Sequence, residues 1–382
     1  FSLLFLIMLG KIKIYFKENL SLIFFILYFL LQIPGLIFST NKIDNISFIV
    51  SSLTILITIF FINEYFSNKE KKLFIFISLF FLTLVFLLSF ALLLKEYLQG
   101  SNNLYGHFVE NTKFFFNKDS PRSSGLSRSC LIIIMIIYMI EKSFFHKNKI
   151  IFEILKIFFL TVIFLFQSRT IIFLTFISHT LIFIFQSRYS LKNTLKFLSL
   201  YFLIPFTFTV LFMGIYTYQK HKLEVNKTIE FNKEFGEVVD NLEAIEMDYP
   251  LREYNDFTSG RIKDWKEILA KINTNNIFFG SGPQADRFLI NQSASNGILY
   301  SLISSGIIGL LFYILFSIIV FFEICKTILN YREKRNMYFY SCLIILIIML
   351  RSILETSYAV FGIDLIVLIT FYNIIKKQKL KI

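Results

Sequence analysis

Long apolar runs constrain this chain more than any other feature of its sequence. Runs of about 20 apolar residues recur along it, and that is the length needed to cross a hydrocarbon core of roughly 30 Å. The chain has 382 residues, of which 55% are hydrophobic and 17% are charged. A soluble domain cannot bury that much apolar surface. The sequence therefore predicts an all-α fold, a polytopic protein of transmembrane helices.

Ten spanning segments are predicted from these runs, and the fourth and ninth are short enough that we expect them to take further turns from their flanks. They cover residues 20–39, 46–63, 73–94, 129–142, 150–167, 170–186, 197–216, 297–322, 338–350 and 357–375. One set of alternate loops holds 20 Lys and Arg, and the opposite set holds 8 when the longest loop is left out. Because cytoplasmic loops carry the excess of basic residues, both termini are expected in the cytoplasm.

This topology puts two larger loops outside, at residues 95–128 and 217–296. The second holds 10 Lys and Arg against 13 Asp and Glu, a mixed charge that suits a water-facing subdomain. We therefore expect three parts. Residues 1–216 form the first seven helices with the smaller outer loop, 217–296 form an outer subdomain with short helices, and 297–382 form the last three helices with a basic tail.

Neither a metal site nor another cofactor is expected. The three cysteines lie in or beside apolar runs, and the four histidines are scattered without metal-ligand spacing. The net charge of +13 raises nucleic acid as a partner. Basic loops that set membrane topology explain this charge better, so we expect membrane lipids and no nucleic acid as partners.

The stretch 258–309 differs from the rest because it combines charge, glycine and the only tryptophan. Thr258 or Ser259 can cap a helix that begins at residue 259. Apolar residues then repeat at helical spacing, at Ile262, Trp265, Ile268, Leu269 and Ile272. Two interpretations stay open: a helix lying flat at the membrane surface with Trp265 among the headgroups, or a helix packed on other loop residues.

A turn follows that helix, at residues 279–283, and a run of small residues follows the turn. The turn Gly280-Ser281-Gly282-Pro283 either presents backbone N–H groups to an anion or simply reverses the chain. Ser304, Ser305, Gly306 and Gly309 are small enough to allow close helix packing.

Arginines on the outer side are the informative charged residues, because membrane topology does not explain them. The predicted loops bring five to one surface: Arg122, Arg128, Arg169, Arg261 and Arg351. Glu355 follows the last of them by four residues, on the same helical face. Guanidinium groups bind phosphate with two parallel hydrogen bonds and stay charged. Each arginine alone is explained by contact with lipid headgroups, but together they indicate a site for a lipid pyrophosphate.

Five short motifs, in this order, resemble those of the O-antigen polymerase and O-antigen ligase superfamily of bacterial inner-membrane glycosyltransferases. The motifs are Arg122-Ser-Ser-Gly125, Ser168-Arg169, Gly260-Arg261 with Trp265 and the Gly280-Ser281-Gly282 turn, Asn296 to Gly309, and Arg351-Ser-Ile-Leu-Glu355. The resemblance covers most of the chain by architecture, with ten or more spans and one large periplasmic loop.

The resemblance implies a metal-independent membrane glycosyltransferase of the cell inner membrane that acts in polysaccharide or lipopolysaccharide biosynthesis. Its donor is a glycan on undecaprenyl pyrophosphate, and a chain-length regulator protein is a further expected partner. We assign catalysis to Arg261, Arg351 and Glu355, the last to orient Arg351 or to act as a base. We assign substrate binding to Arg122, Arg128, Arg169, Trp265 and Asn296.

Polymerisation of lipid-linked repeat units is the favoured reaction, and two alternatives remain. Ligases of the superfamily typically carry histidine directly before the asparagine at the loop exit, whereas this chain has Ser295 before Asn296. An O-antigen ligase would transfer the glycan to a lipid A core instead. A lipid-linked oligosaccharide flippase would need charge within its spans, where this chain has little apart from Glu153 and Lys156.

Overall fold

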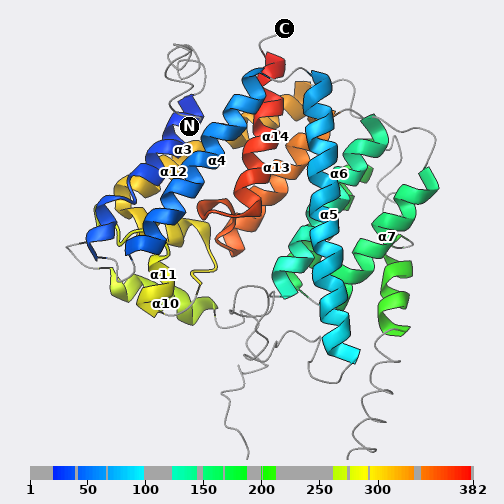
Figure 1. Cartoon of the computed structure of the whole chain (residues 1–382), viewed down its shortest axis with the longest axis horizontal. Helices are drawn as coiled ribbons and strands as arrows, with labels where there is room; N and C mark the ends of the chain where they lie inside the picture. Colours follow the sequence, from blue (N-terminus) through cyan, green and yellow to red (C-terminus); the bar gives the residue numbers. More distant parts are fainter. Residues whose placement is uncertain are drawn as a thin grey trace, which may run out of the picture. The chain divides into compact units, whose positions relative to one another are not determined.

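The computed structural model describes two compact units, each treated by itself. It describes residues 20–38, 42–65, 68–98, 123–143, 149–166, 168–186, 199, 201–211, 261–272, 276–290, 293–330 and 337–379. Unit 1 is Phe1–Ile75 with Asp256–Ile382, and unit 2 is Phe76–Asn255. Figure 1 labels the helices.

Every regular element in these ranges is a helix, which confirms the predicted all-α class. The elements are α3 (Leu20–Leu30), η1 (Pro34–Phe38), α4 (Lys42–Tyr65), α5 (Asn68–Leu98), α6 (Ser123–Ser143), α7 (Lys149–Leu165), α8 (Arg169–Gln186), α10 (Arg261–Lys271), α11 (Ala285–Ile290), α12 (Gly297–Asn330), α13 (Met337–Leu354), η2 (Ser357–Ala359) and α14 (Ile363–Lys379). A shorter apolar helix covers Tyr201–Leu211.

Each of the ten predicted segments contains helix among its described residues, and four helical stretches of the described chain are long and apolar enough to cross a membrane. The four are Leu20–Phe38, Leu73–Ala91, Gly297–Leu329 and Met337–Leu354. The short fourth and ninth segments do take turns from their flanks, because α6 begins at Ser123 and α13 ends at Leu354. The count of ten spans stays a prediction.

Unit 1 is built on α12, which packs against α3 and α13, while α14 packs against α13 and α4 (Figure 1). Aromatic side chains fill the interior of this unit. The rings of Phe25 and Phe316 stack with centroids 4.1 Å apart, and Tyr313 stacks on Tyr358 at 5.2 Å. Buried aromatic pairs of this kind contribute to the packing between helices. The polar ends are paired, since Tyr28 Oη donates to the Ala359 carbonyl at 2.8 Å.

A break in α12 at Gly306 receives the glycine turn predicted from the sequence. Gly306 has φ 67°, which interrupts the helical hydrogen bonds. The turn replaces them: Ser281 N donates to Ile303 O at 2.7 Å, Gly282 N donates to Ser304 O at 3.0 Å, and Ile307 N donates to Ile277 O at 2.8 Å. Non-helical backbone is tolerated in a spanning helix only when protein covers it in this way.

These contacts decide between the two interpretations of the glycine turn. The N–H groups of Ser281 and Gly282 are bonded to carbonyls of α12, so they are not available to an anion. The small residue Gly306 admits this turn, and not a neighbouring helix as the sequence suggested. A Cβ on Gly306 would overlap the carbonyl group of Phe278.

Unit 2 contains a buried ion pair between neighbouring helices. Lys156 on α7 donates to Glu141 on α6 at 2.9 Å and to Glu153 at 2.6 Å. Its ammonium group also lies 4.1 Å from the centroid of the Tyr138 ring. The two charged residues noted in the fifth predicted span, Glu153 and Lys156, are therefore ion-paired. The pair of Lys156 with Glu141 also connects α7 to α6.

The outer loop predicted at 95–128 is shorter at both ends than expected. Helix α5 continues to Leu98 and α6 begins at Ser123. The apolar pattern stops at the charged residues of each helix end, but backbone hydrogen bonding continues past them. Arg128 consequently lies in the second turn of α6 and not in a loop.

Candidate functional site

Arg351 is held at the end of α13 by a buried carboxylate. Its guanidinium Nη1 donates to Asp364 Oδ2, and the two side chains are 8% and 1% exposed. Ser357 Oγ donates to the same oxygen at 2.8 Å. Asp364 lies in the first turn of α14, where the helix dipole favours negative charge. These bonds restrict Arg351 to one position.

Glu355 joins the two arginines that the sequence assigns to catalysis. Its Oε1 accepts from Arg261 Nη2 at 3.0 Å, and its Oε2 lies 4.0 Å from Arg351 Nη2. Arg261 starts α10, whereas Glu355 directly follows α13, so residues 94 positions apart meet here. The Arg261 and Glu355 side chains are 24% and 21% exposed, which leaves the cluster accessible.

Helix α10 is fixed by contacts with the segment that leads into α12. Trp265 Nε1 donates to the Ala294 carbonyl at 2.9 Å, and Ile268 is fully buried. Ile262 and Leu269 stay exposed. Of the two interpretations of this helix, packing on other loop residues fits the contacts of Trp265, because its indole N–H is bonded within the protein. Arg261 is the first residue of α10, one turn before Trp265, so these contacts also fix its position.

Asp286 holds the same segment from its other side. Its Oδ2 accepts from Ala294 N at 2.8 Å and its Oδ1 accepts from Arg287 N at 3.0 Å. Burial raises the pKa of the Asp286 carboxyl above its usual value, although these backbone bonds oppose the rise. Ala294 is therefore bonded through both its N–H and its carbonyl, so the loop exit is rigid.

Asn296 has a structural task at this exit. Its Oδ1 accepts from the N–H groups of Ile298 at 2.8 Å and Leu299 at 3.0 Å, which caps the start of α12. Its Nδ2 donates to the Ile353 carbonyl at 2.9 Å and ties that start to the end of α13. Sugar binding by Asn296 stays a prediction.

The remaining predicted site residues do not lie in unit 1. Arg169 is exposed at the first position of α8, and Arg128 is half-buried in α6; both belong to unit 2. Arg122 lies outside the described residues. The structure thus brings together Arg261, Arg351 and Glu355, with Trp265 and Asn296 supporting the same region, and the convergence of all five arginines stays a prediction.

Residues 154–314 match a family model described as O-antigen ligase. The match supports membership of the O-antigen polymerase and ligase superfamily. No curated protein and no solved structure matches the chain.

The superfamily comprises membrane glycosyltransferase-like enzymes, polymerases and ligases. The apolar helices of this chain agree with a membrane location. The matched range contains α10, the glycine turn and the break in α12, but Arg351, Glu355 and Asp364 lie beyond it. The match does not separate polymerase from ligase.

Two residues of this region were missed by sequence reasoning. Asp364 and Asp286 each follow an ordinary loop, and neither has a spacing that singles it out. The signal for Asp286 is burial of a carboxylate beside backbone donors, which is visible only in the folded chain. An Asp within an apolar segment is rare enough that Asp364 could have been noted as a partner for Arg351.

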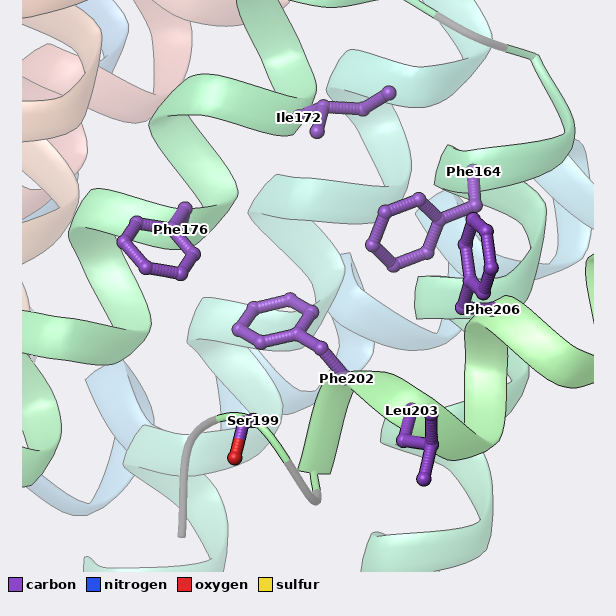
Figure 2. Close-up of a pocket in the computed structure, with 7 residues that line it drawn as sticks. All are labelled: Phe164, Ile172, Phe176, Ser199, Phe202, Leu203 and Phe206. Carbon is purple, nitrogen blue, oxygen red and sulfur yellow. The ribbon is translucent and has the colours of Figure 1, made fainter. Parts of the chain in front are cut away.

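Unit 2 contains one described histidine, His179, and an apolar pocket. His179 Nδ1 donates to the Thr175 carbonyl at 2.8 Å, as expected of a core histidine. No group of three metal ligands occurs in the part of the chain that the structure describes. Figure 2 shows an apolar pocket of about 320 Å³, where side chains of α8 face those of the helix Tyr201–Leu211. Its lining is Phe164, Ile172, Phe176, Ser199, Phe202, Leu203 and Phe206, which suits hydrocarbon and not a sugar.

Proposed function

We propose that this chain polymerises oligosaccharide repeat units carried on undecaprenyl pyrophosphate into a surface polysaccharide, O-antigen or capsule. The reaction takes place at the periplasmic face of the bacterial inner membrane. The chain crosses that membrane about ten times with both termini in the cytoplasm, and residues 217–296 form the periplasmic subdomain.

The observation that carries the proposal is the meeting of Arg261, Arg351 and Glu355. The two guanidinium groups flank one carboxylate, and a carboxylate resembles a phosphate in charge and in its acceptor oxygens. A pair of arginines spaced to hold one anion suits the diphosphate of a lipid-linked donor. Buried Asp364 keeps Arg351 in place for this task.

The reaction requires charge stabilisation and a general base from these residues. A hydroxyl oxygen of the acceptor sugar attacks the anomeric carbon of the donor glycan, and the bond from that carbon to the pyrophosphate oxygen breaks. Arg261 and Arg351 stabilise the negative charge that develops on the leaving pyrophosphate, as a metal does in other transferases. A carboxylate beside them, Glu355, accepts the proton of the attacking hydroxyl.

An O-antigen ligase is the second candidate, favoured by the description of the matching family model. It uses the same donor and the same arginine pair, but its acceptor is a lipid A core. Ser295, at the position where ligases carry histidine, favours the polymerase. Ser295 has φ 48°, so the residue stands on a strained turn directly before Asn296.

Deleting the gene in its host and running the surface polysaccharide on a gel distinguishes these candidates. A polymerase is indicated by loss of the length ladder while core carrying one repeat unit remains. Complete loss of capped core indicates a ligase or the flippase alternative and contradicts the polymerase.

Variants then test the arginine site in the complemented host. Arg261→Ala and Arg351→Ala are each expected to abolish the ladder. Lys266→Ala is the matched control, because it removes a positive charge from an exposed position of the same helix α10. A normal ladder with both arginine variants rules out the proposed site.

A further inference from the structure

Each arginine of the site has a carboxylate partner before any ligand binds. Arg261 is paired with Glu355, and Arg351 is paired with Asp364. A diphosphate brings further negative charge, which both carboxylates repel at short range. One carboxylate must therefore leave its arginine before the two guanidinium groups can hold such a ligand together.

The two carboxylates are held with different strength. Asp364 is 1% exposed and accepts a second hydrogen bond from Ser357. Glu355 is 21% exposed, and its separation of 4.0 Å from Arg351 is longer than a hydrogen bond. An ion pair that water can reach, like that of Glu355 with Arg261, contributes little stability. Glu355 is the carboxylate that an incoming anion can displace.

Arg351 also keeps hydrogen-bonding capacity that the described part of the protein leaves unused. Its Nε is buried without a hydrogen-bond partner among these residues. A guanidinium carries five N–H donors in a fixed plane, and the bond to Asp364 engages the Nη1 end. The site thus contains an anchored guanidinium with spare donors, next to a weakly held carboxylate.

We propose that Glu355 is an exchangeable counter-ion, whose carboxylate occupies in the ligand-free protein the position that a donor phosphate takes on binding. The inference rests on the proposed function for the identity of this anion, the diphosphate end of a lipid-linked glycan. The exchange replaces the ion pairs of Glu355 with phosphate–guanidinium pairs and changes no covalent bond. Glu355 is then released beside the leaving group.

Binding of inorganic pyrophosphate to the purified full-length protein in detergent tests this exchange, with calorimetry as the measurement. Glu355→Gln removes the competing charge and keeps the length of the side chain. We expect it to bind pyrophosphate about tenfold more tightly than the unmodified protein, equivalent to about 1.4 kcal/mol. Glu355→Ala is expected to change the affinity in the same direction, and it serves where the glutamine variant does not fold.

Glu323→Gln is the matched control. Glu323 is also ion-paired, to Lys376 at 2.8 Å, and is also partly exposed, but it lies near the other end of α12 from Asn296. Its substitution is expected to leave the affinity for pyrophosphate within twofold. A similar gain in this control would mean that general loss of negative charge strengthens binding, and the exchange would be wrong.

Three further outcomes decide the matter. Unchanged or weaker binding by the Glu355 variants overturns the exchange, and so does an absence of pyrophosphate binding in both variant and unmodified protein. The double variant Arg261→Gln with Glu355→Gln is expected to lose the gain; a gain that persists places the anion elsewhere and overturns the exchange.

The exchange and the proposed function fail separately. A Glu355→Gln gain in affinity, together with a ladder that does not depend on Arg261 and Arg351, supports the anion exchange and rejects the polymerase. A ladder that needs both arginines, without any gain in affinity, rejects the exchange and leaves the polymerase standing.

Discussion

At the scale of single residues, the three side chains of the candidate site differ in their surroundings. Arg351 is buried and fixed by Asp364, Arg261 is partly exposed on a short helix, and Glu355 lies between them. A fixed cation beside an adjustable one suits a substrate that must enter and leave. The burial of each group, and not its type alone, determines which of these parts it takes.

Asp364→Ala is expected to destabilise the protein by about 3–5 kcal/mol, because Arg351 would keep a buried charge without its carboxylate. Thermal unfolding of the purified protein in detergent measures this loss. Glu323→Gln, which alters a more exposed ion pair, should cost about 1 kcal/mol or less. Equal losses in the two variants would contradict a special role for Asp364.

Asp286 gives the stability a pH dependence of known sign. Its pKa is raised in the folded protein, so the folded state binds a proton more readily than the unfolded state. The resulting stabilisation is present below the unfolded pKa and is lost as pH rises through the folded value. The variant Asp286→Asn has no titrating group at this position. It should be less stable by about 1 kcal/mol, because its single amide oxygen leaves one backbone N–H without a good acceptor.

The measurement for Asp286 is denaturation of both proteins between about pH 4 and about pH 7, which brackets a raised carboxyl pKa. The stability advantage of the unmodified protein over Asp286→Asn should shrink as pH rises. An advantage that grows with pH would mean that the backbone bonds outweigh burial in the folded protein.

At the scale of elements, the site depends on how a loop turn is inserted into a helix. The break in α12 at Gly306 accepts the Gly280–Gly282 turn, and this turn lies between α10 and α11 in the chain. Trp265 and Asp286 then hold Ala294, immediately before α12 begins. The position of Arg261 therefore depends on the hydrogen bond of Trp265 to Ala294 and on the insertion of the following turn into α12.

Gly306→Ala is expected to abolish the ladder and to destabilise the protein by about 1–3 kcal/mol at least, the cost of a strained backbone position. Its φ is positive, and the new Cβ would meet the backbone of Phe278. Gly125→Ala in α6 is the control, since a Cβ there has no heavy atom of the described residues within 4 Å. The control should be neutral or more stable by about 0.5–1 kcal/mol. Thermal unfolding and the ladder assay read both effects, and a tolerated Gly306→Ala would contradict the packed break.

At the scale of the whole molecule, the basic loops and apolar helices together predict a membrane topology that can be tested. Four helical stretches of the described chain meet the length and apolarity needed for crossing, and the other predicted spans are helical but shorter or more polar. Polar residues in such helices are tolerated where they pair, as Lys156 pairs with Glu141.

Labelling with a membrane-impermeant maleimide tests the predicted orientation in a version lacking Cys130, Cys325 and Cys342. A cysteine at Leu269, which is exposed on α10, should react from the periplasmic side. A cysteine appended after Ile382 should react only after the membrane is permeabilised, because the basic tail is predicted to be cytoplasmic. The opposite pattern would invert the topology and remove the site from the periplasmic face.

The sequence by itself determined the helical membrane class, and it predicted which residues bind phosphate. Both depend on local information: apolar runs of sufficient length, and an Arg351 to Glu355 spacing that fits one helical face. Only the tertiary structure decided which of these residues meet. Asp364 as the partner of Arg351, Asn296 as a cap, Trp265 as a donor to Ala294 and Gly306 as a helix break all depend on the atoms that lie opposite each of them. Those atoms come from residues distant in the sequence or depend on local backbone geometry, which apolar periodicity and charge counts do not encode.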